Sequence, residues 1–353
     1  MPRESYPMKP VETIMLAQAI VGEAHGGAER FFVKLAIALH EAGLRQSLFI
    51  GRDRERFEEL SDAGLTVQQF DFGKGILGWQ ATRTFRKALA AKQPDVVLAW
   101  MNRAARRIPA GSYKRVARFG GYYPLKYYAG FDWIICNTPD LERHVIEQGW
   151  NETRTSTISN FGELPAAPPV RRADFDTAED AFVVLACGRL HPSKGFDTLI
   201  RAMETVPDAV LWLAGAGEEE GALRQLAGQL DVASRIRFLG WRHDQSSLLE
   251  QADLCAVPSR HEPLSNVVIE AWSKNVAVVA TASEGPSWLL GETHSVGTLV
   301  AIDDHQALAA AISALAQDDE RRAAVAKAGF LKWQSGFSKQ AIINQYISFL
   351  QTI

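Results

Sequence analysis

Short apolar runs alternate with segments of helical periodicity along the whole 353-residue chain. Residues 26–43 show the pattern of a helix that ends at Gly43, and residues 337–351 show that of an amphipathic helix. The predicted strands are the runs at 13–21, 46–51, 65–70, 95–100 and 132–138 in the first half and at 181–188, 209–215, 235–240, 254–259, 276–281 and 296–300 in the second. Because strand and helix alternate, the sequence predicts an α/β protein in which helices cover both faces of parallel sheets.

The alternation breaks once, at residues 161–176, where three prolines follow Leu164 and no periodicity is visible. Proline fixes the backbone and donates no hydrogen bond, so we interpret this segment as a linker between two Rossmann-like, doubly wound domains. Open parallel sheets bind ligands at the carboxyl ends of their strands, so we expect the domains to face a ligand cleft. The predicted boundaries are 1–162 for the first domain, 163–178 for the linker, 179–335 for the second domain and 336–353 for a C-terminal helix that packs back on the first domain.

Composition narrows the class of protein. With 47% hydrophobic and 22% charged residues, the chain is globular rather than disordered. The net charge of -3 gives no overall attraction to nucleic acid, and we predict no nucleic-acid partner. Cys136, Cys187 and Cys255 form no CxxC pair and have apolar neighbours, which is typical of buried thiols in a reducing compartment. No apolar run is long enough to span a bilayer and no signal peptide is visible, so we expect a cytoplasmic protein.

The strongest motif is the segment 260–270, which follows a predicted buried strand and opens a helix in which Pro263 suits the first position. Amides at a helix start bind phosphate or hydroxyl oxygens, and here they belong to Leu264, Ser265 and Asn266. Glu262 and Glu270 are eight residues apart, about 12 Å along an ideal helix, so they could hold both sugars of a pyrophosphate-bridged substrate. The alternative is a first-turn charge and a solvated carboxylate, but the apolar neighbours of Glu270 favour a function.

Two other loops carry phosphate-binding features. Arg189 and Lys194 follow the predicted strand 181–188 and precede a helix at Gly195, which suits a diphosphate clamp, although loop cations are often merely solvated. Gly26 and Gly27, between the first strand and the first helix, allow a ligand to approach the backbone closely, although an ordinary turn explains them equally well. The histidines show no metal-ligand spacing, and we predict no metal site.

Taken in order, these motifs resemble those of the retaining GT-B glycosyltransferases usually called family 4. The resemblance rests on GGAER, GRLHPSKGFDTLI, the GAG after the next strand, RIRFLGW and Glu262-x7-Glu270, and it covers most of the chain. It implies a GT-B fold, a nucleotide-diphosphate sugar bound mainly on the second domain, an acceptor bound on the first, and no metal or other cofactor.

The resemblance also implies a role for each matching residue. Arg189 and Lys194 match the pair that holds the donor diphosphate, and Glu262 matches the carboxylate that orients the transferred sugar, so these three are the predicted catalytic residues. The other predicted donor contacts are Gly26 and Gly27 over the phosphates, Gly240 and Trp241 at the base, the backbone of Leu264, Ser265 and Asn266, and Glu270 at the ribose.

One position departs from the family pattern. Many relatives have a histidine near the end of the strand here at 95–100, where it contacts the transferred sugar, and this chain has Trp100 instead. The role of that histidine is therefore unassigned, and Asn102 or Arg103 is a substitute only as a hypothesis.

A local excess of positive charge lies at 103–126, a segment without Asp or Glu. Basic residues and tyrosines favour an anionic membrane surface, so we predict contact with the inner face of the membrane or with the acceptor; a solvated face is the alternative. The residues concerned are Asn102, Arg103, Arg106, Arg107, Lys114, Arg115, Arg118, Tyr122, Tyr123 and Lys126.

Together these features predict a retaining glycosyltransferase that uses a UDP- or GDP-sugar. Its predicted acceptor is a glycan or a lipid-linked glycan in cell-envelope polysaccharide or lipopolysaccharide synthesis. Two alternatives stay open, a nucleotide-sugar epimerase or hydrolase on the same fold, and a catalytically silent protein that binds nucleotide sugars.

Overall fold

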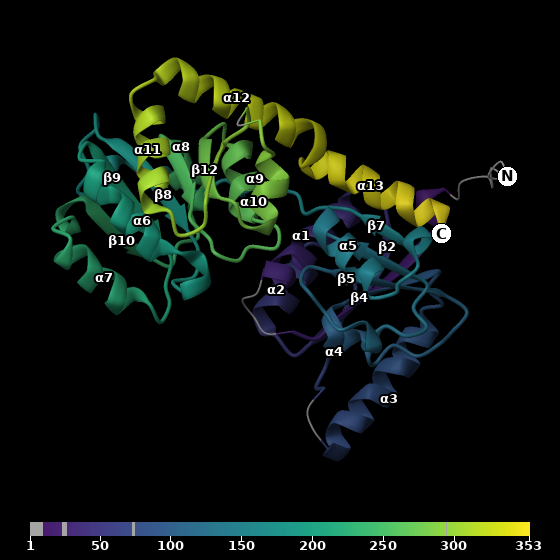
Figure 1. Cartoon of the computed structure of the whole chain (residues 1–353). Helices are drawn as coiled ribbons and strands as arrows, with labels where there is room; N and C mark the ends of the chain where they lie inside the picture. Colours follow the sequence, from purple (N-terminus) through teal and green to yellow (C-terminus); the bar gives the residue numbers. More distant parts are fainter. Residues whose placement is uncertain (1–9, 23–26, 73–74, 294) are drawn as a thin grey trace. The chain divides into compact units, whose positions relative to one another are not determined.

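The computed structural model describes residues 10–22, 27–72, 75–293 and 295–353 (Figure 1). The chain divides into two compact units. Unit 1 comprises Met1–Asn160 and Lys339–Ile353, and unit 2 comprises Phe161–Ser338. Each unit is built on one parallel sheet that is combined with helices, which confirms the predicted α/β class with two Rossmann-like sheets.

Unit 1 holds a seven-stranded sheet in the order β3-β2-β1-β4-β5-β6-β7. Its strands are β1 (Met15–Ile20), β2 (Arg45–Gly51), β3 (Val67–Phe70), β4 (Val96–Trp100), β5 (Lys114–Phe119), β6 (Trp133–Cys136) and β7 (Thr155–Thr157). Its helices are α1 (Gly27–Glu41), α2 (Arg54–Asp62), α3 (Gly75–Ala91), α4 (Met101–Ala105), α5 (Pro139–Glu147) and α13 (Lys339–Thr352). The central strands β1 and β4 are buried almost throughout, which explains why their sequences are nearly continuous apolar runs.

Unit 2 holds a six-stranded sheet in the order β10-β9-β8-β11-β12-β13. Its strands are β8 (Phe182–Cys187), β9 (Ala209–Ala214), β10 (Ile236–Gly240), β11 (Leu254–Val257), β12 (Ala277–Thr281) and β13 (Thr298–Val300). Its helices are α6 (Phe196–Ala202), α7 (Glu220–Gln229), α8 (Gln245–Gln251), α9 (Asn266–Ser273), α10 (Glu284–Leu290), α11 (His305–Ala316) and α12 (Asp319–Gly336).

The sheet of unit 2 is covered on both faces. Val184 and Ala186 of β8 lie in one buried cluster with side chains of α6, α7 and α11. Val183 and Leu185 lie in a second cluster with side chains of α8, α9 and α10. Successive side chains of a strand point to opposite faces, so the two clusters are the two layers of a doubly wound sheet.

Two strands of unit 1, β5 and β7, were not predicted from the sequence. β7 has only three residues, too few for a visible pattern. β5 lies within the basic segment, where Lys114, Arg115 and Arg118 interrupt the apolar residues. In the structure β5 pairs with β4 on one side and β6 on the other, so it is an internal strand of the sheet.

Arg118 is consequently buried, with an exposed fraction of 2%. Its guanidinium donates to the hydroxyl of Tyr346 at 2.7 Å, to the carbonyl of Phe119 at 2.6 Å and to Oδ1 of Asn160 at 2.8 Å. A guanidinium held in this way cannot reach a membrane or an acceptor. The prediction that Arg118 lies on a binding surface is therefore wrong, because strand pairing turns this side chain into the interior.

Residues 163–178, which we set apart as a linker, belong to unit 2 in the structure. Arg172 donates to the carbonyl of Gln251 at 3.0 Å and to the carboxylate of Asp253 at 2.9 Å. The ring of Phe175 packs against Trp212 with 5.0 Å between centroids. The prolines prevent a long regular element, but Arg172 and Phe175, which follow them, still anchor the segment to the rest of unit 2.

The three cysteines are free thiols. Burial raises the pKa of Cys136 and of Cys255 to about 12, so both are neutral at physiological pH. Among the helices of the described residues, none combines the length and the hydropathy needed to cross a membrane.

Candidate active site

The three predicted catalytic residues follow two neighbouring strands in unit 2. The order of strands reverses between β8 and β11, and ligands of doubly wound sheets bind at such a switch point, outside the carboxyl ends of the strands. Arg189 and Lys194 lie in the loop after β8, and Glu262 lies in the loop after β11. The structure therefore brings these residues to the edge of the sheet where a ligand is expected.

Lys194 and Glu262 form an ion pair in which Nζ contacts Oε2. Both side chains are largely buried, with exposed fractions of 26% and 16%, and Ser259 donates its hydroxyl to the same carboxylate oxygen at 3.3 Å. Arg189 is exposed, and within the described residues its guanidinium has no hydrogen-bonding or ionic partner. The site thus holds one cation beside a carboxylate and a second cation that is available to an anion.

Arg260 joins the two loops that carry this ion pair. Its backbone N–H donates to the carbonyl of Ser193 at 2.8 Å. Its guanidinium makes a bidentate contact with Asp197 at 2.7 and 2.8 Å and a contact with Asp303 at 2.6 Å. Burial alone would raise the pKa of Asp197, but the Arg260 guanidinium outweighs it and holds that pKa below its usual value. Arg260 therefore links the loops after β8 and β11, a role that the sequence analysis did not identify.

Glu284, the first residue of α10, fixes the backbone of Glu262. One of its carboxylate oxygens accepts from the N–H of Glu262 at 3.0 Å, and the other lies 2.7 Å from Nδ1 of His261. Partial burial favours the neutral acid, yet these hydrogen bonds and the charge of His261 lower the pKa of Glu284 overall. The carboxylate form that holds the loop is thus the stable one at neutral pH.

The helix after the motif begins later than the sequence suggested. α9 starts at Asn266 rather than Pro263, and Ser265 precedes it in a left-handed conformation with φ 73°. Glu262 is therefore not on the helix, and the spacing of about 12 Å along a helix axis does not apply. Proline at a first helical position is only a statistical preference, and the strained turn at Ser265 delays the helix by three residues.

The loop before α9 still presents polar groups for a ligand. Within the described residues, the backbone N–H groups of Leu264 and Ser265 have no acceptor. The Ser265 hydroxyl is buried and also lacks a hydrogen-bond partner. Buried polar groups are normally satisfied, so these three groups are suited to the oxygens of a bound phosphate or sugar.

Gly285 gives this loop its position, and its replacement by alanine tests that contact. A Cβ at Gly285 would lie 2.2 Å from the carbonyl oxygen of Leu264. We expect Gly285→Ala to displace the loop, to lower stability by about 1–3 kcal/mol and to weaken nucleotide binding. Gly228→Ala is the matched control, because nothing lies within 4 Å of a Cβ there. Chemical denaturation would measure stability and calorimetry would measure nucleotide binding. If the Gly285 variant bound nucleotide as well as the unchanged protein, the assignment of the loop before α9 to ligand binding would be wrong.

Glu270 lies on α9 and is 9% exposed. Gln245 at the start of α8 donates Nε2 to one of its carboxylate oxygens at 3.0 Å. Its negative charge adds to burial in raising the pKa of Cys187, the last residue of β8, and of Cys255. This electrostatic effect on Cys187 indicates that Glu270 lies near the carboxyl end of β8. The hydrogen bond from Gln245 was not predicted.

Gly240 and Trp241 lie at the end of β10, two strands from the switch point. Gly240 has a φ of 67°, which suits glycine, and the side chain of Trp241 is 45% exposed. A cavity of about 470 Å³ lies beside them. Residues 166–170 and 241–244 line it. This cavity has an aromatic ring on one side and the proline-rich segment on the other, which fits a flat ring system.

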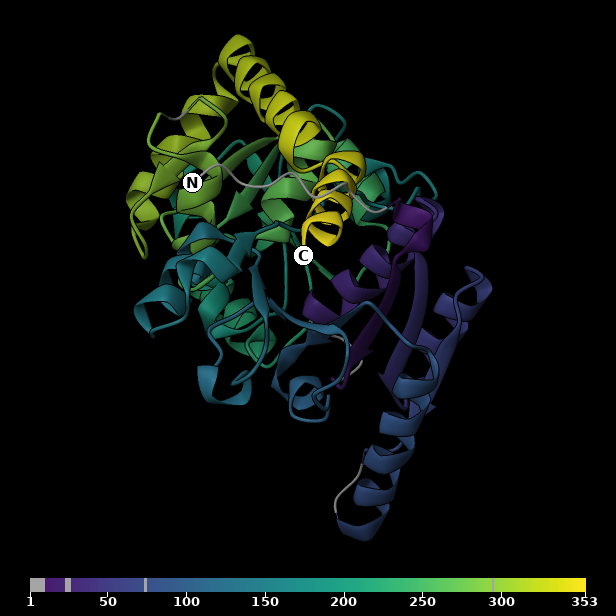
Figure 2. The ribbon, with the colours of Figure 1, turned by 90° about the vertical axis from the view of Figure 1, so that its right-hand side faces the viewer.

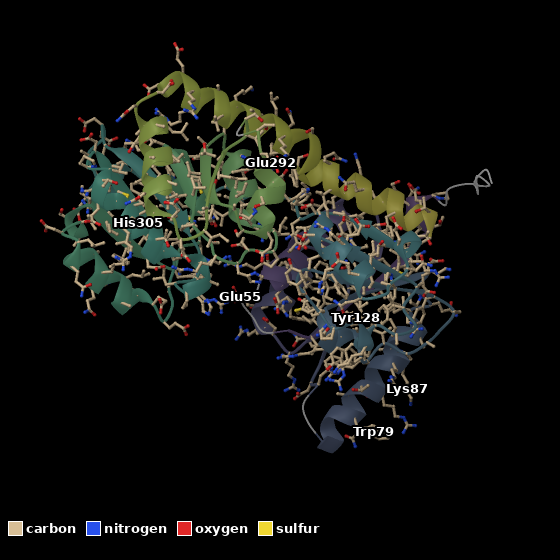
Figure 3. The ribbon with its side chains drawn as sticks, viewed as in Figure 1. Glu55, Trp79, Lys87, Tyr128, Glu292 and His305 are labelled. Carbon is tan, nitrogen blue, oxygen red and sulfur yellow. The ribbon has the colours of Figure 1, made fainter. Side chains whose placement is uncertain are left out.

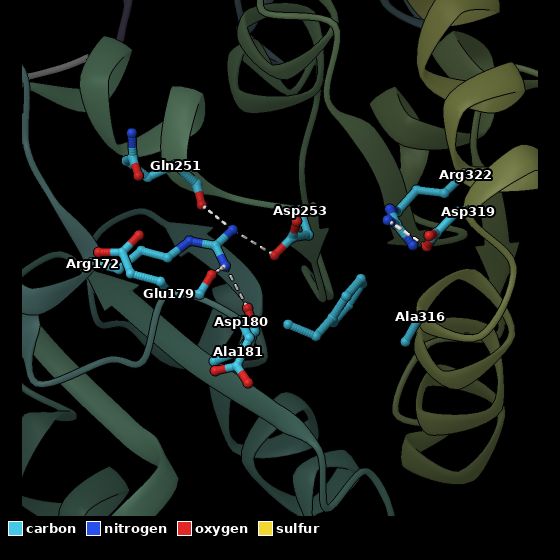
Figure 4. A pocket seen from close by; sticks show the side chains of 10 residues that line it. Arg172, Glu179, Asp180, Ala181, Gln251, Asp253, Ala316, Asp319 and Arg322 are labelled. Atoms are coloured by element: carbon cyan, nitrogen blue, oxygen red, sulfur yellow. Dashed lines mark hydrogen bonds and ion pairs between the residues drawn. The ribbon is translucent and has the colours of Figure 1, made fainter.

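A second cavity, of about 590 Å³, opens on the other edge of the same sheet (Figure 4). Phe182 at the start of β8 and Asp253 just before β11 help to line it. The guanidinium of Arg172 is occupied there by Asp253 and backbone carbonyls. Because it lies at the amino ends of the strands and its cations are already paired, we assign it no ligand.

The predicted site residues of unit 1 lie in different environments in the structure. Gly26 lies outside the described residues, and Gly27 is the first residue of α1. Trp100 is buried, and its indole N–H donates to Oε1 of Gln18 at 2.9 Å, so it belongs to the interior of the unit. The Oδ1 of Asn102 accepts from the hydroxyl of Tyr128 at 2.7 Å.

The rest of the basic segment is mostly at the surface. Tyr127 has two cations against its ring, those of Arg106 and Lys126, each 5.1 Å from the centroid. Arg115 contacts the carbonyl of Gly130, and Tyr122 donates to Asp140 at 2.5 Å. The exposed members are Arg103, Arg106, Lys114, Tyr122 and Lys126, whereas Asn102, Arg107, Arg115 and Tyr123 are half-buried. Among the described residues, no three His, Cys, Asp or Glu side chains gather as metal ligands would.

Comparisons with known proteins identify the family of the chain. Residues 181–318 match the family model described as Glycosyl transferases group 1, and residues 25–161 match that of Glycosyltransferase Family 4. Two similar proteins are the lipopolysaccharide core biosynthesis glycosyltransferases LpsD and LpsE of Rhizobium meliloti (strain 1021). LpsD is 38% identical over 330 residues, which cover 91% of this chain and 94% of LpsD. LpsE is 37% identical over 329 residues, which cover 92% and 96%.

Solved structures share the fold at lower identity. Anabaena Alr3699/HepE in complex with UDP and glucose has a TM-score of 0.82 and 22% identity, covering 96% of this chain and 100% of that one. The lipopolysaccharide outer core galactosyltransferase WaaB, in its apo form, has a TM-score of 0.75 and 12% identity, covering 96% and 99%. The motifs, the two sheets and the relatives lead to one conclusion: this chain belongs to the family 4 glycosyltransferases and is a glycosyltransferase with the GT-B fold.

Proposed function

We propose that this enzyme transfers a sugar, with retention of configuration, from a nucleotide-diphosphate sugar to a glycan of the lipopolysaccharide core. The arrangement of Lys194, Glu262 and Arg189 at the switch point of unit 2 carries the proposal, because it offers two cations to a diphosphate and a carboxylate to sugar hydroxyls. The acceptor class is supported by the names of LpsD and LpsE. A UDP-sugar donor is supported by the Anabaena HepE complex with UDP-glucose, which has a TM-score of 0.83 at 22% identity.

In this proposal each residue has a defined role toward the donor. Arg189, Lys194 and the amides of the loop before α9 bind the diphosphate. Glu262 accepts hydrogen bonds from hydroxyls of the transferred sugar, and Glu270 accepts them from the ribose. The base lies against Trp241 in the cavity beside β10.

The reaction we propose is a front-face displacement. The bond between the anomeric carbon and the diphosphate oxygen breaks, and a bond from that carbon to the acceptor oxygen forms on the same face. The leaving phosphate takes the proton of the acceptor hydroxyl. Arg189 and Lys194 offset the negative charge that grows on the diphosphate, so this chemistry needs no metal.

The experiment combines the purified enzyme with UDP- and GDP-sugars, and with core oligosaccharides of increasing truncation. We expect a glycosylated product that forms only with acceptor present, and NMR of the new linkage should show the anomeric configuration of the donor. Donor consumption without acceptor would favour the epimerase or hydrolase alternative. Nucleotide binding without turnover on any acceptor would favour the silent binding protein.

We further propose a cytoplasmic location with peripheral contact to the inner face of the membrane. A lipid-linked core glycan would be presented there, and unit 1 carries the exposed cations Arg103, Arg106 and Lys126. Fractionation of cells into membrane and soluble parts at low and high salt tests this. Release of the enzyme from membranes by salt is the expected result.

A further inference from the structure

The surface of α3 combines positive charge with an exposed aromatic ring. α3 contains Arg83, Arg86 and Lys87 and no Asp or Glu. On its inner side Phe85 and Leu89 are buried in the core of unit 1. Trp79, Arg83 and Lys87 are spaced by four residues, so they form one stripe along the helix, and all three are exposed.

The cations of this stripe lack counter-ions. Within the described residues, Lys87 has no ionic partner, and Arg83 contacts only the ring of Trp79, at 5.8 Å from the centroid. In α2, by contrast, Arg54 pairs with Glu58 one turn away at 2.7 Å, and in α7 Arg224 pairs with Glu220 at 2.8 Å. The absence of such pairs leaves a positive potential along α3 that an anionic partner would neutralise.

The charge continues from α3 onto α4 and the loop after it. Arg86 donates Nε to the carbonyl of Arg107 at 3.2 Å, which brings the two elements together. Burial lowers the pKa of Arg107, and the positive charges of Arg106 and Arg103 lower it further. Like charges are therefore gathered on this surface, and no acid of the described residues contributes to that pKa.

Trp79 indicates what kind of anionic partner fits. It is 63% exposed, more than any other large hydrophobic side chain of the described residues. Figure 2 shows the amino-terminal half of α3 extending beyond the other elements of unit 1, and Figure 3 shows Trp79 on that half, with Lys87 further along the helix. Tryptophan prefers the interface between water and lipid, and basic side chains prefer anionic headgroups.

We propose that the stripe formed by Trp79, Arg83 and Lys87 docks on the surface of an anionic phospholipid bilayer. The stripe deepens the proposed function, because it names the surface that would hold the enzyme beside a lipid-linked acceptor. Trp79 enters the headgroup region, while Arg83 and Lys87 contact phosphates. This proposal concerns α3 alone, and it holds whether or not residues 103–126 contact lipid.

The test measures binding of the full-length enzyme to vesicles of phosphatidylglycerol and phosphatidylcholine, with pure phosphatidylcholine vesicles for comparison. We expect binding to the anionic vesicles only, weakened by salt. Arg83→Gln/Lys87→Gln should lower the partition coefficient about 30-fold, and Trp79→Ala should lower it further when added. Arg54→Gln/Arg321→Gln is the control, because it removes two exposed charges elsewhere and should leave binding unchanged.

Several outcomes would overturn the docking surface. It fails if the α3 variants bind anionic vesicles as tightly as the unchanged enzyme, or if the control variant loses as much binding. It also fails if duplex DNA competes with the vesicles at equal phosphate concentration, since the surface would then be a nucleic-acid site. A second assay separates this proposal from the proposed function. It measures sugar transfer by the unchanged enzyme to a water-soluble core oligosaccharide without vesicles. Absence of transfer in that assay would refute the proposed function but would leave the docking surface untouched.

Discussion

Lys194→Ala will lower kcat by about 10²–10³-fold while the protein remains folded. The reason is that Lys194 lies at the switch point beside Glu262, where negative charge would grow on the leaving diphosphate. Both side chains are largely buried, so the substitution leaves the Glu262 carboxylate without its cation and should also cost about 1–3 kcal/mol of stability. Steady-state kinetics with the donor, together with urea denaturation, would measure both effects.

A matched variant controls for the loss of a lysine ion pair. Lys339 pairs with Glu41 in unit 1, with exposed fractions of 35% and 54%. Because this pair is more exposed, Lys339→Ala should lower stability by no more than about 1 kcal/mol, and it should leave kcat unchanged. If Lys194→Ala and Arg189→Ala both retain full kcat/KM, the two residues do not bind the diphosphate, and the proposed donor site is wrong.

Arg118→Met will destabilise the protein by about 2–4 kcal/mol, the second large effect that we expect. The substitution removes the guanidinium that donates to the hydroxyl of Tyr346, the Oδ1 of Asn160 and the carbonyl of Phe119 in a buried site. The Phe119 carbonyl keeps its hydrogen bond from the N–H of Asn137 at 3.1 Å. A buried polar group that loses a hydrogen-bond donor costs free energy of unfolding, and here three groups lose one donor at once. Urea denaturation followed by circular dichroism would measure the change in the free energy of unfolding.

Arg106→Met provides the comparison within the same basic segment. The side chain of Arg106 is exposed, and among the described residues its one contact is the stacking on Tyr127, so its loss should change stability by less than about 1 kcal/mol. If Arg118→Met lowered the free energy of unfolding as little as Arg106→Met does, the buried hydrogen bonds of Arg118 would contribute little to stability. Vesicle binding should be the same for folded Arg118→Met as for the unchanged enzyme, because that side chain does not reach the surface.

The loops of the proposed donor site were predictable because their residues are close in sequence to strand ends. Arg189 and Lys194 follow β8 directly, and Glu262 follows β11 within a few residues. In a parallel sheet, the ends of neighbouring strands meet at one edge, so local motifs already imply proximity. The details of the loop were less accessible, since the left-handed turn at Ser265 and the later start of α9 are not visible as a pattern.

Long-range contacts account for what sequence reasoning missed. Arg260 stood within the strongest motif, yet its partners Asp197 and Asp303 are 63 and 43 residues away. Nothing in the pattern of the segment indicates that it would clamp the loop after β8. In the same way, the basic composition of 103–126 predicted a surface, and the pairing of β5 with β4 and β6 buried part of it.

By itself, the sequence determined the α/β class, the two doubly wound sheets and the gathering of Arg189, Lys194 and Glu262 at one sheet edge, because strand and helix periods and motif spacing are local properties. Only the tertiary structure decided which charged residues stay in solvent. Arg118 is buried beside Tyr346, which is 228 residues away, whereas Trp79 is 63% exposed, and no described element of unit 1 covers it. Burial depends on neighbours that are distant in the chain, and so it cannot be inferred from a residue's own segment.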